Sequence, residues 1–225
     1  MPVFQLTNEI IFPPPELAEP DGLLAVGGDL SPARLLAAYQ QGLFPWYSGK
    51  EPILWWSLSP RLVLFPEEFH LSKSLARTIR RQVYQVSADT AFAEVIAACA
   101  AVRQETGTWI TQEMQAAYIH LYELGFAHSI ECRFEGELVG GLYGVCLDKM
   151  FFGESMFSLR DDASKVALAA LVNHAKQLGI QAIDCQMTTA HMLRFGSHEL
   201  DRPIFQELLD QSIQCVQSQP RWQLA

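Results

Sequence analysis

The apolar segment IQAIDCQ, at residues 180–186, ends in an aspartate and a glutamine. Both residue types can form hydrogen bonds to a reacting group and assist proton transfer. The segment predicts a strand, and side chains two positions apart on a strand lie on the same face. Asp184 and Gln186 should therefore point together, with Cys185 on the opposite face. A carboxylate and an amide so placed can bind a polar substrate and accept its hydrogen bonds, although an aspartate with a pKa of about 3.9 is a weak base. The pattern by itself is more typical of two solvated residues.

Aromatic side chains are concentrated in LFPWYSGKEPILWWS at residues 43–57, which holds Trp46, Trp55 and Trp56. Two prolines and a glycine interrupt helix and strand alike, so this segment should be mostly surface loop. A tryptophan is ordinarily a core residue, and Trp55 and Trp56 can be explained as packing the loop against the rest of the protein. Exposed tryptophans also suit the binding of single-stranded nucleic acid, where stacking contributes roughly 1–3 kcal/mol per base.

Four cations fall on one side of a predicted amphipathic helix in HLSKSLARTIRRQ at residues 70–82. The spacing places them opposite an apolar face, and they are Lys73, Arg77, Arg80 and Arg81. Such a stripe is ordinarily a solvated helix surface. Because no acidic side chain accompanies it in a chain whose net charge is −9, the stripe also predicts a local site for phosphates.

Composition excludes several other kinds of chemistry. The net charge argues against a general nucleic-acid binder, and 49% hydrophobic with 18% charged residues predict a sizeable core. Five scattered cysteines without a C-x-x-C pair indicate reduced cytosolic thiols and not a metal site or disulfide framework. Gly27 and Gly28 are not followed by the lysine of a phosphate-binding loop, so a turn is expected. No secretory signal or membrane span is recognisable, and we expect a cytoplasmic protein.

Sequence periodicity predicts helices at about residues 32–41, 70–81, 89–102, 111–124 and 162–178, then two short helices near the C-terminus. Residues 127–158 alternate as strands, with turns at Glu135–Gly136 and Asp148–Lys149. Helices, an antiparallel meander, a helix and a further strand make an α+β protein. The change in composition near Pro60 predicts a small N-terminal domain at residues 1–60 and a second domain, with a mixed and mainly antiparallel sheet, at residues 61–225.

The order of elements in the second domain resembles the acyltransferase fold of the N-acetyltransferase superfamily. Those enzymes hold the pyrophosphate of coenzyme A on backbone amides of a glycine-rich loop at the start of a helix. The corresponding junction here is SLRDDASK, at residues 158–165, which has two adjacent acids and no glycine. It would repel a pyrophosphate, so the donor of an acyltransferase with this sequence should not be acyl-CoA.

Seven motifs in one order make a more specific resemblance, and all lie within residues 21–186: DGLLAVGGDLSPARLLAAYQQGLFPW, ILWWS, GTWIT, ELVGGLYGV, FFGESMFS, ASK and DCQ. Together they resemble the bacterial leucyl/phenylalanyl-tRNA–protein transferases. The resemblance implies an aminoacyltransferase that takes Leu or Phe, with Met as a further candidate, from aminoacyl-tRNA. The acceptor would be the α-amine of proteins that begin with Lys or Arg, and the added residue would mark these proteins for degradation. Because the aminoacyl ester is already activated, we expect no cofactor and no metal. We also expect a monomer.

The same resemblance assigns roles to individual residues. Asp184 and Gln186 would contact the reacting amine and ester, and Glu154 would hold Gln186 in orientation. Trp46 and Trp109 would hold the terminal adenosine of the tRNA. The amino-acid pocket would be apolar and shaped for an unbranched Cβ, with a lining made of Leu142, Phe151, Met156, Leu168 and Ile183. The cationic helix face would contact the tRNA backbone.

Two other interpretations stay open at this point. A coenzyme A-dependent N-acetyltransferase would fit the order of elements but lacks the pyrophosphate loop. A non-catalytic tRNA-binding module would need the cationic helix but would have no use for Asp184, Gln186 and Glu154 together. Transfer of an amino acid from aminoacyl-tRNA to a peptide amine separates all three.

Overall fold

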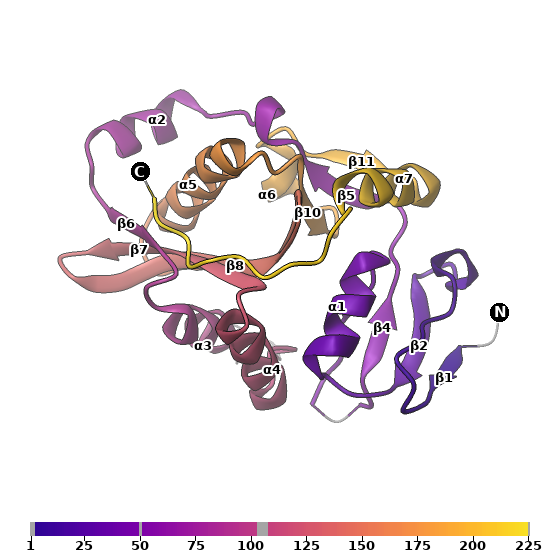
Figure 1. Cartoon of the computed structure of the whole chain (residues 1–225). Helices are drawn as coiled ribbons and strands as arrows, with labels where there is room; N and C mark the ends of the chain where they lie inside the picture. Colours follow the sequence, from indigo (N-terminus) through magenta and orange to yellow (C-terminus); the bar gives the residue numbers. More distant parts are fainter. Residues whose placement is uncertain (1–2, 50, 103–107, 225) are drawn as a thin grey trace.

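Two β-sheets organise the chain in the computed structural model, which describes residues 3–49, 51–102 and 108–224 (Figure 1). The smaller sheet is formed within residues 4–56, and the larger one by strands from residue 61 onward. The expected α+β class, with a small N-terminal unit and a mixed, mainly antiparallel sheet, is confirmed. One hydrophobic core includes residues of both sheets, so the division into separate domains near residue 60 stays a prediction.

The smaller sheet has the strand order β1 (Phe4–Leu6), β2 (Leu23–Gly27), β4 (Leu54–Trp56), β3 (Phe44–Pro45). Most of the described residues in 43–57 lie outside helices and strands, as predicted, but several of them, such as Leu43 and Tyr47, are buried and not at the surface. Strands β3 and β4 pair with each other inside this segment. The prolines do not prevent it, since Pro45 lies on an edge strand, where the missing N–H costs no ladder hydrogen bond. Trp55 is completely buried and its Nε1 donates to the Gly27 carbonyl over 2.9 Å, as expected for a core tryptophan.

Helix α1 (Pro32–Gln40) begins and ends as predicted from its sequence. The Ser31 side chain accepts a hydrogen bond from the Arg34 backbone N–H, and Pro32 occupies the first turn. Gly42 follows the helix with a φ of +71°, and a Cβ there would lie 2.7 Å from the Phe205 ring. This capping fixes the direction in which α1 presents Tyr39 to the rest of the molecule.

The larger sheet has seven strands among the described residues, in the order β11 (His198–Leu200), β5 (Arg61–Leu64), β10 (Ala182–Gln186), β9 (Met150–Ser158), β8 (Glu137–Leu147), β7 (Ala127–Phe134), β6 (Gln85–Ala88). Neighbouring strands are antiparallel except β9 and β10, which are parallel and are joined by helix α5 (Ala163–Leu178). A parallel pair needs such a crossover. The predicted turns at Glu135–Gly136 and Asp148–Lys149 connect β7 to β8 and β8 to β9.

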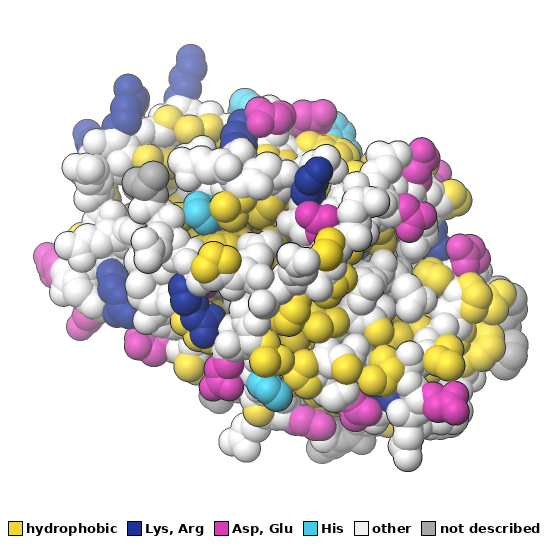
Figure 2. All heavy atoms as spheres, in the orientation of Figure 1, with side chains coloured by type: hydrophobic (Ala, Val, Ile, Leu, Met, Phe, Trp, Pro, Cys, Tyr) yellow, Lys and Arg dark blue, Asp and Glu magenta, His cyan; other side chains and the backbone are white. Residues whose placement is uncertain are grey.

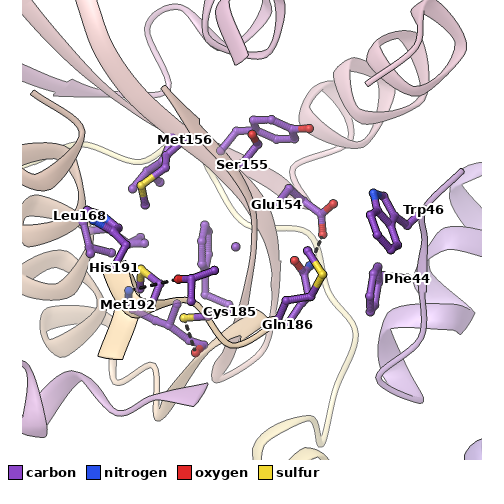
Figure 3. Close-up of a pocket in the computed structure, with 18 of the residues that line it drawn as sticks. Phe44, Trp46, Glu154, Ser155, Met156, Leu168, Cys185, Gln186, His191 and Met192 are labelled. Atoms are coloured by element: carbon purple, nitrogen blue, oxygen red, sulfur yellow. Dashed lines mark hydrogen bonds between the residues drawn. The ribbon is translucent and has the colours of Figure 1, made fainter. Parts of the chain in front are cut away.

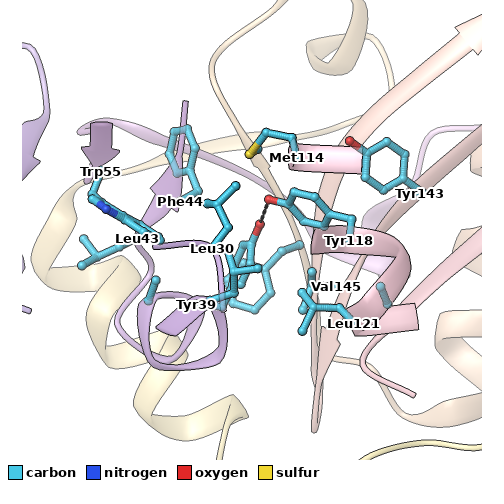
Figure 4. Packing of buried hydrophobic residues seen from close by; sticks show 14 of the residues in the cluster. Leu30, Tyr39, Leu43, Phe44, Trp55, Met114, Tyr118, Leu121, Tyr143 and Val145 are labelled. Atoms are coloured by element: carbon cyan, nitrogen blue, oxygen red, sulfur yellow. Dashed lines mark hydrogen bonds between the residues drawn. The ribbon is translucent and has the colours of Figure 1, made fainter. Parts of the chain in front are cut away.

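Helices cover both faces of the larger sheet (Figure 1). Helices α3 (Phe92–Ala101) and α4 (Gln112–Glu123) pack on one face, where their core continues into the N-terminal unit (Figure 4). Helix α5 packs on the other face, and α2 (Lys73–Arg80) lies against it through Leu75. The helices expected at 70–81, 89–102 and 111–124 are thus present with shorter limits. None of the helices in the described ranges is long and apolar enough to cross a membrane.

The C-terminal part contains the two expected short helices, α6 (Ala190–Leu193) and α7 (Arg202–Ser212), separated by β11. The Gln206 side chain, on α7, donates from Nε2 to the Gln41 carbonyl over 3.0 Å and so ties α7 to the end of α1. After α7, residues 213–224 contain no helix or strand and run past the sheet toward the side of the molecule that carries α2 (Figure 1). Two short 3₁₀ turns, η1 (Pro15–Leu17) and η2 (Pro66–Glu68), complete the described secondary structure.

Candidate active site

A cavity of about 350 Å³ lies beside the junction of the two sheets, and its lining comes from β3, β8, β9, β10, α5 and α6 (Figure 3). Trp46 and Phe44 stand on one side of the close-up, and Leu168 and Met192 on the other. Glu154 and Gln186 lie between these two groups. The cavity therefore offers an aromatic end, an apolar end and a polar middle.

The aromatic end contains Trp46, one of the two tryptophans that the family resemblance singled out. Trp46 and Trp109 line the cavity, and both are only half-buried. Trp56 fixes the backbone of Trp46, because its Nε1 donates to the Trp46 carbonyl over 2.7 Å and the two rings meet edge to face at 5.6 Å. Trp56 thus holds Trp46 in position, and it is Trp46 that lines the cavity.

The apolar end contains all five residues predicted for an amino-acid pocket, and these are Leu142, Phe151, Met156, Leu168 and Ile183. Other lining residues were not predicted, among them Leu171 on α5 and His191 and Met192 on α6. Gly144 explains part of the GGLYG motif, since a Cβ at this position would lie 2.6 Å from the Phe151 ring. The five predicted pocket residues are brought together by the adjacent strands β8, β9 and β10 and by helix α5.

Asp184 and Gln186 do not share a face in the way that a regular strand predicts. The register of β10 against β5 shifts between these two residues, and Gln186 has a φ of +57°. The irregularity turns Gln186 and Cys185 both toward the cavity, whereas Asp184 is completely buried and is not part of its lining. Burial raises the pKa of the Cys185 thiol to about 12, so this cysteine is not an activated nucleophile.

Asp184 forms an ion pair with Arg61, a buried arginine that no sequence pattern indicated. Arg61 donates from Nε over 2.8 Å and from Nη2 over 2.6 Å to the two carboxylate oxygens of Asp184. Its guanidinium lies 4.8 Å from the ring centres of both Phe44 and Phe205. Asp184 Oδ1 also accepts from the Gln186 backbone N–H over 2.8 Å. The pair therefore fixes the irregular backbone of Gln186, and the carboxylate is not available as a general base.

Glu154 lies at the centre of a buried hydrogen-bond network that joins helices α1 and α4 to the larger sheet. Its Oε1 is 2.7 Å from the Tyr39 hydroxyl, its Oε2 is 2.9 Å from the Tyr118 hydroxyl, and the two hydroxyls are 2.5 Å apart (Figure 4). Tyr39 comes from α1 and Tyr118 from α4. The Gln186 side chain donates from Nε2 to Oε1 over 3.0 Å. The expected contact between Glu154 and Gln186 is therefore present, and the two tyrosines are additional.

A count of protons indicates that Glu154 is neutral in this network. The two tyrosines and Glu154 form three oxygen–oxygen contacts, and each contact needs one proton. The two phenols supply two protons, and burial keeps both phenols neutral because it raises their pKa values well above 10.0. Burial also raises the pKa of Glu154 from 4.5 to about 7, because its effect and that of the Asp184 charge exceed the opposing effect of the hydrogen bonds from Tyr39, Tyr118 and Gln186. A neutral carboxyl supplies the third proton.

The network determines which atom of Gln186 can meet a substrate. Because Nε2 is engaged by Glu154, the amide oxygen is the group that can accept a hydrogen bond from an incoming amine. The site can therefore align an amine with an acyl group beside it, while the walls exclude water from the apolar end. Within the described ranges, no three His, Cys, Asp or Glu side chains gather in a group that could hold a metal ion.

The cationic face of α2 is present as predicted. Lys73, Arg77, Arg80 and Arg81 are all exposed, and none forms an ion pair with a residue that the structure describes. Dark blue side chains accordingly project over α2 in the space-filling view (Figure 2). At the start of α5, Lys165 instead pairs with Asp162 over 2.7 Å. An unpaired positive surface is therefore available at α2.

Comparison with known proteins identifies the class. A family model described as leucyl/phenylalanyl-tRNA protein transferase matches residues 63–210, and the model of its N-terminal domain matches residues 28–59. A relative from Syntrophobacter fumaroxidans is 56% identical and covers 99% of this chain and 96% of its own length. Another from Aromatoleum aromaticum is 60% identical over 86% of this chain and 83% of its own length. Both carry the name leucyl/phenylalanyl-tRNA–protein transferase.

These matches make the protein an aminoacyltransferase. More particularly, the chain belongs to the leucyl/phenylalanyl-tRNA protein transferase family. Among solved structures, an N-acetyltransferase from Kribbella flavida is similar over 75% of this chain and 60% of its own, with 13% identity and a TM-score of 0.43.

Proposed function

We propose that this aminoacyltransferase moves Leu, Phe or, as a further candidate, Met from aminoacyl-tRNA to the α-amine of proteins that begin with Lys or Arg. The new N-terminal residue would mark the acceptor for degradation. The observation that carries the proposal is the order of groups along one cavity, from Trp46 through Gln186 to the apolar end, with Trp109 also in the lining. This order matches the order of adenosine, ester and side chain in the 3′ end of an aminoacyl-tRNA.

In the proposed donor complex, the terminal adenine stacks on Trp46 and Trp109. Aromatic stacking is the usual way to hold an unpaired base, and it contributes roughly 1–3 kcal/mol per base. The amino-acid side chain enters the apolar end, and the ester then lies beside Gln186. A cavity of about 350 Å³ is large enough for an aminoacyl group and too small for a tRNA, so most of the tRNA remains outside.

In the proposed reaction the acceptor amine attacks the ester carbonyl. The N–C bond forms, the bond between the carbonyl carbon and the ribose oxygen breaks, and the amine proton passes to that leaving oxygen. The Gln186 amide oxygen accepts a hydrogen bond from the amine and directs its lone pair to the carbonyl. Glu154 is a positioning residue for the Gln186 side chain, and Asp184, held by Arg61, is a positioning residue for its backbone.

The exposed cations of α2, namely Lys73, Arg77, Arg80 and Arg81, are proposed to contact phosphates of the tRNA body. Their exposure and lack of described ionic partners support this role. Such contacts would anchor the tRNA without reading its sequence, so one surface could serve tRNAs for several amino acids. Because aminoacyl-tRNAs occur in the cytoplasm, we propose that the reaction takes place there, and we propose a monomeric enzyme.

The proposal is tested by incubating the protein with labelled leucyl-tRNA, an Arg-starting peptide and, in a parallel reaction, labelled acetyl-CoA. Transfer of leucine to the peptide amine, with none to an N-acetylated copy of the same peptide, is the expected result. Transfer from acetyl-CoA would support an N-acetyltransferase instead. Binding of leucyl-tRNA without transfer to any peptide would support a binding module and would contradict the proposal.

A further inference from the structure

The C-terminal segment at residues 213–224 is held firmly although it has no regular secondary structure. The Gln219 backbone N–H donates to the Gly125 carbonyl over 2.7 Å, and the Trp222 backbone N–H donates to Asp89 Oδ2 over 2.7 Å. The Arg221 guanidinium lies 3.3 Å from the centre of the Tyr122 ring. The segment runs along the molecule (Figure 1), and these contacts fix the chain up to and including Trp222.

Trp222 is an almost fully buried part of the core behind the cavity, with 4% of its surface exposed. Its ring stacks on His128 at 4.1 Å, meets His174 edge to face at 4.9 Å, and packs against Phe151 at 5.7 Å. Phe151 is the important contact, since this residue also lines the apolar end of the cavity. Trp222 is therefore one residue removed from any ligand in the pocket.

Phe151 has little freedom between its neighbours. On one side, the Gly144 backbone is so close that a Cβ would lie 2.6 Å from the ring tip, and on another side Trp222 blocks the ring. Closely packed aromatic rings transmit a change of volume to their neighbours because interiors contain few voids. Loss of the Trp222 ring would therefore leave space into which Phe151 can withdraw, and the apolar end would become deeper.

We propose that Trp222 sets the depth of the donor side-chain pocket by holding Phe151 in place, which makes the C-terminal segment a determinant of donor specificity. The proposal rests on the assignment of the apolar end to the donor side chain in the proposed function. Trp222 does not touch substrate and acts only through Phe151. This pocket depth suits Leu and Phe donors and disfavours a bulkier indole side chain.

The test compares Trp222→Ala, Trp222→Leu and the conservative Trp222→Phe with wild-type protein. The donors are leucyl-, phenylalanyl- and tryptophanyl-adenosine, and the acceptor is one Arg-starting peptide. Because apolar pockets discriminate by about tenfold or more for small differences in fit, Trp222→Ala should raise the ratio of kcat/KM for the tryptophanyl donor over the leucyl donor by about tenfold. Trp222→Phe should stay closer to wild type. Trp222→Leu carries the test if Trp222→Ala does not fold.

Two controls separate the possible failures. Phe12→Ala removes a buried aromatic that packs on Trp55 in the N-terminal sheet, and it should leave the donor ratio unchanged. Leu168→Ala alters the cavity lining directly. If Leu168→Ala changes the donor ratio and the Trp222 variants slow all donors equally, Trp222 is only structural and the inference is overturned while the pocket assignment stands. If neither changes the ratio, both fail.

Discussion

Replacing Glu154 by Gln should reveal the protonation state of the buried network through the stability of the protein. Burial raises the pKa of Glu154 from 4.5 to about 7 in the folded protein. A group whose folded pKa exceeds its unfolded pKa stabilises the protein at low pH, and this stability is lost as the pH rises through the folded pKa. Wild-type protein should therefore lose stability between about pH 4.5 and pH 7 through this residue.

The magnitude follows from the two pKa values. One pKa unit corresponds to about 1.4 kcal/mol, so the rise from 4.5 to about 7 limits the effect to about 3 kcal/mol. Integration of both titrations between about pH 5 and about pH 8 gives roughly 2.5 kcal/mol. Glutamine is isosteric and keeps the contacts with Tyr39 and Tyr118 but cannot ionise. Relative to wild type, Glu154→Gln should thus gain about 2.5 kcal/mol of unfolding free energy across this range.

The assay is urea unfolding of both proteins at the two pH values, followed by tryptophan fluorescence. The quantity of interest is the difference between variant and wild type, because other titrating groups cancel in it, and the m-values must agree. Ser155→Ala, at the next residue of the same strand, removes no ionisable group and should differ from wild type by the same amount at both pH values. If the Glu154→Gln difference is also independent of pH, or falls as pH rises, Glu154 is not the neutral centre of the network.

Gln186→Ala should lower single-turnover transfer by about a hundredfold with little change in donor affinity, because the amide oxygen acts on the amine and not on the tRNA; wild-type turnover would contradict this role. A donor carrying isoleucine should have a kcat/KM about ten- to a hundredfold below that of leucine, since branching at Cβ adds a misplaced methyl group, and equal values would argue against the pocket. Replacing Arg77 and Arg80 by Ala should lower the salt slope of tRNA binding by about two while sparing aminoacyl-adenosine. Trp46→Ala should weaken both donors at an unchanged slope, and normal tRNA binding by the double arginine variant would make α2 a solvated surface.

Features set by local sequence were predicted well. The start and end of α1 depend on Ser31, Pro32 and Gly42, whose effects extend over a few residues. The turns between β7, β8 and β9 likewise depend on adjacent residues. The family resemblance supplied Trp46, Trp109, Glu154, Gln186 and the five apolar pocket residues, and all of these line one cavity in the structure, whereas Asp184 does not.

The missed features depend on distant partners. Arg61 and Asp184 are 123 positions apart, and Tyr39 and Glu154 are 115 positions apart, so no spacing rule could join them. The positive φ of Gln186 is stabilised by the Asp184 carboxylate and would be unfavourable in a regular strand. Strands β1, β2, β5, β6 and β11 have three to five residues each, which is too short for an alternating pattern to stand out.

The most direct test is a structure of the protein with a non-hydrolysable phenylalanyl-adenosine in which an amide replaces the ester. We expect the adenine on Trp46, the phenyl ring in the apolar end beside Phe151 and Leu168, and the linking carbonyl next to the Gln186 side chain. Titration by fluorescence before crystallisation would establish that binding saturates at one site. An analogue bound with its phenyl ring at the tryptophans, or outside this cavity altogether, would contradict the proposed arrangement of donor and catalytic groups.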